Sequence, residues 1–171
     1  MKNLIKSPSS LALVFALAML ATPSLASDAD DMAKLGKEGN LVCGDCDFSG
    51  EDLRSNTNFF KADLHGVDFT GSNLSGMNLR GANLKGADFT EANLTNTILT
   101  QADLTNADFH DADLTGASLG GADLTGAEVD RANFTDANLT KAILDEDSFD
   151  YATVCRTTIP DGRVTNRDCD D

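Results

Sequence analysis

The chain has no tryptophan, one tyrosine, three prolines and few basic residues. Its 171 residues include 13 Lys and Arg against 28 Asp and Glu, which gives a formal net charge of -15. So few cations argue against direct binding to nucleic acid phosphates or to an anionic membrane surface. Hydrophobic residues make up 41% of the chain, too many for a disordered acidic tail. We therefore expect a folded domain whose partners include neither nucleic acid nor membrane.

The longest apolar run, residues 11–20, is too short for a membrane-spanning helix, which needs about 20 residues. It follows Lys2 and Lys6 and precedes small residues at Ser24 and Ala26, the arrangement of a secretory signal peptide. We predict that residues 1–26 are removed on export. No Cys follows this point, so lipid attachment of the bacterial lipoprotein type is not indicated. Cleavage takes away two Lys and no acid, which leaves 28 acids against 11 bases and a net charge of -17.

The rest of the chain repeats with a period of five. Every fifth residue from Phe59 to Val154 is apolar, usually Leu or Phe, and the preceding residues are often Ala and then Asp or Asn. Five residues advance 500° on an α-helix, and on a strand an odd step reverses the face, so neither element keeps these positions together. Only a chain that turns at every repeat can point all of them inward. No Pro interrupts the region, which argues against a disordered low-complexity repeat.

The copies ADLHG, ANLKG, ADFTE, ANLTN and ADLTG resemble the pentapeptide-repeat family. The resemblance implies an all-β fold, a right-handed quadrilateral β-helix with four repeats per coil. In that fold the apolar centre and the small residue two before it face inward, and the other three face outward.

Residues twenty apart should then stack. One file of centres reads Phe69, Phe89, Phe109, Val129 and Phe149, and another is entirely Leu. This segregation supports a coil of twenty residues, and five such coils make a column about 24 Å tall. Upstream, Leu53 and Phe59 are six residues apart, so we predict one inserted residue in this corner and an incomplete coil before it.

The ends of a solenoid need closing. We predict a short helical cap in residues 27–40, repeats from 41 to 154, and a C-terminal cap in residues 155–171 with a turn at Pro160–Gly162. The tail resembles that of some exported members of the family. A disulfide between Cys155 and Cys169 would pin this cap and stabilise it by about 3 kcal/mol.

For Cys43 and Cys46 the sequence leaves two alternatives, a disulfide between them or two free thiols. The four cysteines together have the composition of a zinc site, but the two pairs lie at opposite ends of the column, so we expect no metal site. A redox role for Cys43 and Cys46 is disfavoured because neither follows a helix N-terminus and both occupy inward positions.

Catalytic groups are scarce. His65 and His110 fall on adjacent faces two coils apart, too far for a shared metal ion, and no nucleophile with a base or phosphate-binding loop stands out. We expect no catalytic residue, no metal and no cofactor.

The outward positions instead show a pattern of charge. The face that bears the Phe file carries eight acids, with Arg131 as its only cation. The opposite face carries Lys61, Arg80 and Lys141 and no acid. The candidate interaction face consists of Asp68, Asp88, Glu91, Asp108, Asp111, Glu128, Asp130 and Asp150.

Three functions are compatible with these features. The first is a rigid extracytoplasmic structural or interaction module that binds an unknown protein, as a monomer or an end-to-end dimer. The second is mimicry of DNA, as in the quinolone-resistance members of the family, although eight acids over about 24 Å are sparser than DNA phosphates, which occur every ~1.7 Å. The third is binding of divalent cations by the acids, or of an ice surface by the file of Ser75, Thr95, Thr115 and Thr135. We expect the compartment to be the periplasm, the thylakoid lumen if the source is cyanobacterial, or otherwise the extracellular medium.

Overall fold

The computed structural model describes residues 41–54, 58–145 and 149–169. The predicted signal peptide of residues 1–26 and the predicted helical cap of residues 27–40 lie outside the described residues. Within those ranges no helix is long and apolar enough to cross a membrane.

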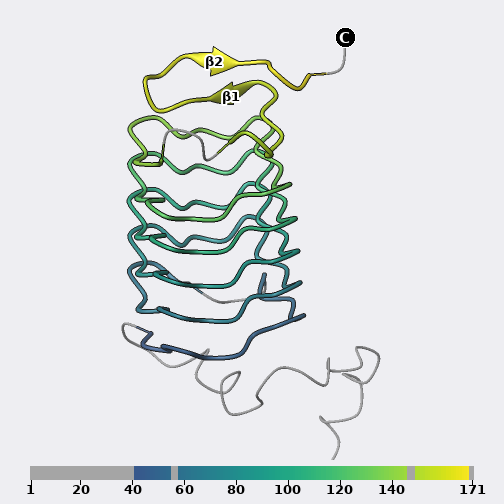
Figure 1. The fold of residues 1–171 in the computed structure, drawn as a ribbon. Helices are drawn as coiled ribbons and strands as arrows, with labels where there is room; N and C mark the ends of the chain where they lie inside the picture. Colours follow the sequence, from purple (N-terminus) through teal and green to yellow (C-terminus); the bar gives the residue numbers. More distant parts are fainter. Residues whose placement is uncertain (1–40, 55–57, 146–148, 170–171) are drawn as a thin grey trace, which may run out of the picture.

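Successive coils stack on one another and form a column (Figure 1). Short parallel bridges join residues twenty apart, as between Asp63 and Asn83 and between Asn83 and Asp103. The Leu64 N–H donates to the Asn83 carbonyl at 2.8 Å, and the Asn83 N–H donates back to the Ala62 carbonyl at 2.9 Å. Twenty residues are four pentapeptides, so the predicted coil length is confirmed.

Each pentapeptide turns for reasons visible in its own residues, as residues 88–92 illustrate. The Phe89 carbonyl accepts a hydrogen bond from the Ala92 N–H at 2.9 Å, which closes the turn. Glu91 takes a left-handed conformation with φ of 58°, a position where many other repeats have glycine, which adopts it without strain. The Asp88 carboxylate accepts the Thr90 N–H at 2.8 Å.

The centre residues and the small residues two before them fill the interior, as predicted. Every described centre from Phe59 to Val154 is buried except Leu144 and Phe149, which are partly buried. Rings stack along one file, with centroid separations of 5.3 Å between Phe69 and Phe89 and 5.0 Å between Phe89 and Phe109. The core is therefore continuous from coil to coil.

The first coil is offset by one residue. Asp47 pairs with Asp68, twenty-one residues away, whereas Asp68 pairs with Asp88, twenty residues away. The predicted insertion between Leu53 and Phe59 is thereby confirmed, although residues 55–57 of that corner lie outside the described ranges.

The sequence pattern predicts that the repeats stop at Val154, but the ladder continues for one more pentapeptide. Thr158 pairs with Asn138 in the same parallel register. Thr157 occupies the small inward position, is fully buried, and donates its hydroxyl to the Phe134 carbonyl at 2.7 Å. The pattern concealed this repeat because threonines replace both the usual Ala and the usual Asp or Asn.

The chain then reverses direction. Strand β1 (Thr157–Thr158) pairs antiparallel with strand β2 (Val164–Thr165), which lies at the top of the column in Figure 1. The Gly162 N–H donates to the Ile159 carbonyl at 2.9 Å, so the predicted turn at Pro160–Gly162 is confirmed. This hairpin covers the edge that a further parallel coil would use.

Candidate interaction surface

Four of the eight acids predicted for the interaction face form one continuous ladder. Asp68 pairs with Asp88, Asp88 with Asp108, and Asp108 with Glu128. Because neighbouring strands are about 4.8 Å apart, acidic side chains recur at that spacing along the column. Asp47 lies next to Asp68 and extends the file. We call these five residues the acidic ladder.

Sequence reasoning missed Asp47. Counting back twenty residues from Asp68 reaches the centre Phe48, because the inserted residue shifts the register. The six-residue step from Leu53 to Phe59 is the signal in the sequence that would have identified Asp47, because it makes the spacing across this corner twenty-one residues.

The other four predicted acids lie beside the ladder, in the turns. Glu91 and Asp111 have left-handed φ of 58° and 57°. The Asp111 N–H donates to the Asp130 carbonyl at 3.1 Å, which stacks these two turns. Asp150 is exposed in the next coil. The structure therefore places all eight residues on the outside of the column, with four in a single ladder.

Arg131 neutralises one of these acids. Its guanidinium contacts both carboxylate oxygens of Asp111, at 2.7 and 2.5 Å, and lies 2.5 Å from Nε2 of His110. The hydrogen bond from Arg131 holds the pKa of Asp111 below its usual range. This pair is exposed, so its contribution to stability is small. The ladder carboxylates are not among the groups that Arg131 contacts.

Turn chemistry does not explain why the ladder residues are acidic. The Asp108 carboxylate accepts the His110 N–H at 2.8 Å, and the Asn93 amide oxygen accepts the Thr95 N–H at 3.0 Å in the equivalent position of another face. Asp and Asn therefore close the turn in the same way. On the ladder every described residue at this position is nevertheless acidic, from Asp47 to Glu128.

The opposite face has a different character. Its ladder runs through Asn78, Ile98, Ser118 and Asn138 and contains no acid. Ile98 and Phe60 are each 41% exposed. Beside them lie Lys61, whose Nζ sits 5.3 Å from the centroid of the Phe60 ring, Arg80 and Lys141. Within the described part of the chain these three cations make no ion pair, so their positive charge is not neutralised. The predicted difference in charge between this face and the acidic face is therefore present.

The file of Ser75, Thr95, Thr115 and Thr135 lies on a third face. The hydroxyl of Thr95 donates to the Asn93 side chain at 2.8 Å, and that of Thr115 donates to the Asp113 side chain at 2.5 Å. These hydroxyl protons are thus used within their own repeats and do not point to an external ligand.

The two histidines are in separate surroundings, as expected. Nδ1 of His65 lies 2.9 Å from the Asp63 carboxylate, which also accepts a hydrogen bond from the Asn83 amide at 2.8 Å. The hydrogen bond with Asp63 raises the pKa of His65, and the same contact lowers the pKa of Asp63. Across residues 41–54, 58–145 and 149–169, no group of three or more His, Cys, Asp or Glu is arranged to hold a metal ion.

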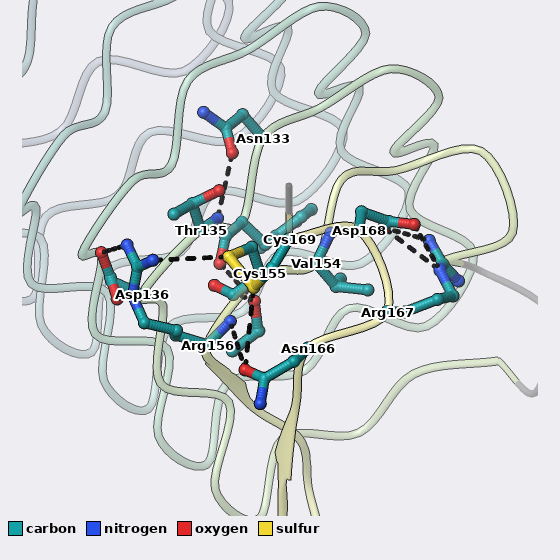
Figure 2. The surroundings of a disulfide bond; sticks show 12 residues. Asn133, Thr135, Asp136, Val154, Cys155, Arg156, Asn166, Arg167, Asp168 and Cys169 are labelled. Atoms are coloured by element: carbon teal, nitrogen blue, oxygen red, sulfur yellow. Dashed lines mark hydrogen bonds and ion pairs between the residues drawn. A yellow bond between two sulfur atoms is a disulfide. The ribbon is translucent and has the colours of Figure 1, made fainter. Parts of the chain in front are cut away.

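Both cysteine pairs are bridged in the structure. Cys43 and Cys46 have Cα atoms 5.5 Å apart and are each 2% exposed. Cys155 and Cys169 have Cα atoms 4.8 Å apart and join the last coil to the C-terminal segment (Figure 2). The two bridges lie in the first coil and beyond the last full coil, so the four sulfurs do not converge.

Comparison with known proteins identifies the family. A family model of pentapeptide repeats matches the chain in eight copies, over residues 43–76, 72–111 and 117–146. The chain belongs to the pentapeptide-repeat family. No curated protein matches it by sequence.

Solved structures of other pentapeptide-repeat proteins resemble this one. Rfr23 from the cyanobacterium Cyanothece 51142 is 23% identical, with a TM-score of 0.52 over 67% of this chain and 84% of its own. HetL from Nostoc sp. strain PCC 7120, involved in heterocyst differentiation regulation, is 27% identical over 74% of this chain and 73% of its own, with a TM-score of 0.43. A thylakoid-lumen protein of Arabidopsis thaliana is 35% identical over 56% of this chain and 63% of its own, with a TM-score of 0.38. The likeness to Rfr23 shows the fold alone.

Proposed function

We propose that this pentapeptide-repeat protein is a non-enzymatic, exported interaction module, a right-handed quadrilateral β-helix whose acidic ladder receives a cationic surface of a protein partner. One observation carries the proposal. The ladder is acidic at every described position, although Asn serves the same turn on other faces. Local folding therefore leaves the acidity of this face unexplained, whereas an external cationic partner accounts for it.

The architecture suits this role. Coils joined by regular hydrogen bonds hold the carboxylates at a fixed spacing of about 4.8 Å, so little side-chain or backbone ordering is needed on binding. Export is supported by the bridges Cys43–Cys46 and Cys155–Cys169, since disulfides persist in oxidising compartments. One acid per ~4.8 Å along the ladder is sparse beside one charge per ~1.7 Å in DNA, so we favour a protein partner over DNA mimicry.

The test compares two triple variants of equal charge. In the first, Asp68, Asp88 and Asp108 on the ladder become Asn. In the second, Asp103, Asp113 and Asp123 on other faces become Asn. All six carboxylates accept the same turn hydrogen bond, at 2.8 to 3.1 Å.

Partners are captured by cross-linking from the exported fraction of the native cell and quantified by mass spectrometry. We expect the ladder variant to lose a partner that the wild-type protein and the second variant both retain, and we expect capture to fall as salt rises. Equal capture by the two variants would refute the assignment of the face.

A further inference from the structure

The two disulfides differ in their accessibility. Cys43 and Cys46 are each 2% exposed, inside the first coil. Cys155 is 7% exposed, whereas Cys169 is partly exposed near the C-terminal edge of the described chain. Thiol–disulfide exchange requires an attacking thiolate to reach one sulfur in line with the bond. Only the second bridge offers a partly exposed cysteine for such an attack.

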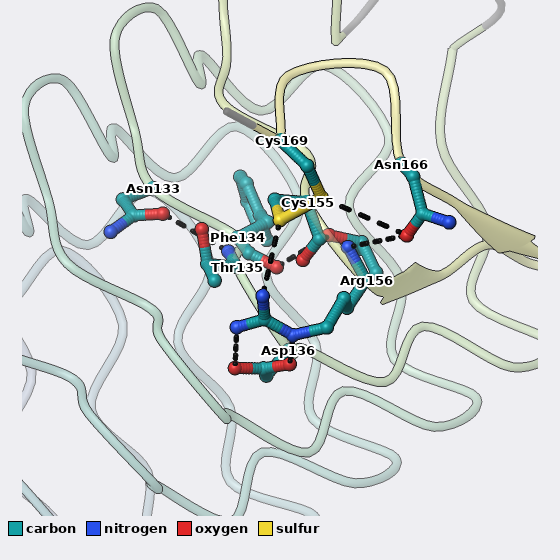
Figure 3. A network of polar contacts seen from close by, with 9 residues as sticks. Asn133, Phe134, Thr135, Asp136, Cys155, Arg156, Asn166 and Cys169 are labelled. Atoms are coloured by element: carbon teal, nitrogen blue, oxygen red, sulfur yellow. Dashed lines mark hydrogen bonds and ion pairs between the residues drawn. A yellow bond between two sulfur atoms is a disulfide. The ribbon is translucent and has the colours of Figure 1, made fainter. Parts of the chain in front are cut away.

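The surroundings of the second bridge also distinguish its two sulfurs. Nη1 of Arg156 lies 3.5 Å from Sγ of Cys155, while Sγ of Cys169 faces the side-chain oxygen of Asn166 at 3.8 Å (Figure 3). The same guanidinium holds Asp136 through two contacts, at 2.6 and 2.7 Å, which fixes its position. A nearby guanidinium stabilises a thiolate, and a more stable thiolate leaves faster.

We propose that Cys155–Cys169 is a thiol–disulfide exchange site for a protein dithiol, with Cys169 as the attacked sulfur and Cys155 as the leaving group. A thiolate of the dithiol bonds to Sγ of Cys169, and the Cys155–Cys169 bond breaks. Cys155 departs as a thiolate beside Arg156. The second thiolate of the dithiol then attacks its own partner sulfur and releases Cys169. The dithiol is oxidised to a disulfide, two electrons reduce the bridge, and the released thiolates take protons from water.

Reduction removes the covalent tie on the segment that closes the column. The remaining ties are hydrogen bonds. Arg167 donates to the carbonyls of Phe149 and Ala152 at 2.8 and 2.5 Å, and the Asp168 carboxylate accepts the Val154 N–H at 2.8 Å. These contacts join residues 167–168 to the backbone of residues 149–154, so the site couples redox state to how firmly the C-terminal segment is held against the last coil.

The experiment uses the full oxidised protein and reduced thioredoxin as the protein dithiol. Samples are quenched with N-ethylmaleimide at successive times, and labelled cysteines are mapped by peptide mass spectrometry. We expect Cys155 and Cys169 to be labelled on the order of tenfold faster than Cys43 and Cys46. Equal rates, or faster labelling of the buried pair, would overturn the proposal.

Variants of Arg156 separate a leaving-group role from a merely structural one. If the guanidinium stabilises the Cys155 thiolate, Arg156→Gln slows reduction by about threefold or more, and Arg156→Lys restores part of the rate. If Arg156 only holds the segment in place, its loss loosens the bridge and both variants are reduced faster, which contradicts the proposal, as does an unchanged rate. Arg163→Gln is the matched control, because Arg163 pairs with Asp161 in the same hairpin, and we expect it to leave the rate unchanged.

Discussion

The inward and outward positions of the same pentapeptide obey different rules. Inside the column, Ala107 and Phe109 are fully buried, and the Phe109 ring stacks on that of Phe89 in the neighbouring coil. Outside, Asp and Asn exchange freely at the turn position, since either accepts the same hydrogen bond. The interior therefore determines the fold and leaves the outward faces available to carry charge.

The largest effect is expected from Phe109→Ala. It removes a fully buried ring whose centroid is 5.0 Å from that of Phe89, and it should lower the free energy of unfolding by about 3–5 kcal/mol. Chemical denaturation followed by circular dichroism measures the change. A loss below about 1 kcal/mol would mean that the file is not closely packed.

A smaller but substantial loss is expected from Ala107→Leu. The fully buried Ala107 lies against the next coil, so added methylene and methyl groups should cost about 1–3 kcal/mol. Thr153→Leu adds a similar side chain at an exposed outward position and serves as the control. If the thermal midpoint of Ala107→Leu equals that of the wild-type protein, the inward placement of this file is wrong.

Two substitutions at Asp108 test whether Asp and Asn are interchangeable at the outward turn position. Asp108→Ala removes the acceptor for the His110 N–H and should cost about 0.5–1.5 kcal/mol. Asp108→Asn keeps an acceptor and should stay within about 0.5 kcal/mol of the wild-type protein. Thermal unfolding of both variants, side by side, distinguishes the stabilising effect of the turn hydrogen bond from that of the negative charge. Equal destabilisation by both would show that the charge itself supports the fold.

The smallest effect concerns the exposed pair of Asp63 and His65. The contact raises the pKa of His65 and lowers the pKa of Asp63. The contribution of His65 to stability is therefore full below its unfolded pKa near 6.5 and is lost as the pH rises through its higher folded value. That of Asp63 is full above about 3.8 and is lost as the pH falls through its lower folded value.

NMR titration of His65 measures this effect. We expect a midpoint above about 6.5 in the wild-type protein and a lower one in Asp63→Asn. A midpoint that does not move in the variant would show that the pair is not formed in solution.

Much of the fold could be predicted from the sequence because an apolar residue recurs at every fifth position from Phe59 to Val154. Apolar residues every fifth position require a turn per repeat, and the files of Phe and Leu indicate the length of the coil. The last pentapeptide was not predicted, because a polar residue, Thr157, fills its small inward position. The buried hydroxyl of Thr157 is accommodated there because it donates a hydrogen bond to the Phe134 carbonyl. That hydrogen bond depends on the neighbouring coil. The sign that the local sequence does carry is Ile159, an apolar residue five positions after Val154.

The candidate site was predicted less completely. The acidic file followed from counting in steps of twenty, but Asp47 escaped because the insertion near residues 54–58 changes the step to twenty-one. The contacts of Arg131 and Arg156 with acids twenty residues earlier also follow from the coil length once it is known. Which of Cys155 and Cys169 is the more exposed residue could not be predicted, because it depends on how the C-terminal segment lies against the last coil.

The twenty-residue coil makes the length and the sidedness of this protein independent of each other. Removing or duplicating twenty residues in the middle shortens or lengthens the column by about 4.8 Å and leaves every outward file aligned. Removing a single pentapeptide instead transfers all later residues to the adjacent side, so Asp68 and Asp88 would share a side with each other but no longer with the acids that follow the deletion. Such a protein can therefore change in height during evolution by whole coils without losing its charged side. Any insertion or deletion that is not a multiple of twenty residues would break the alignment of the acids on that side.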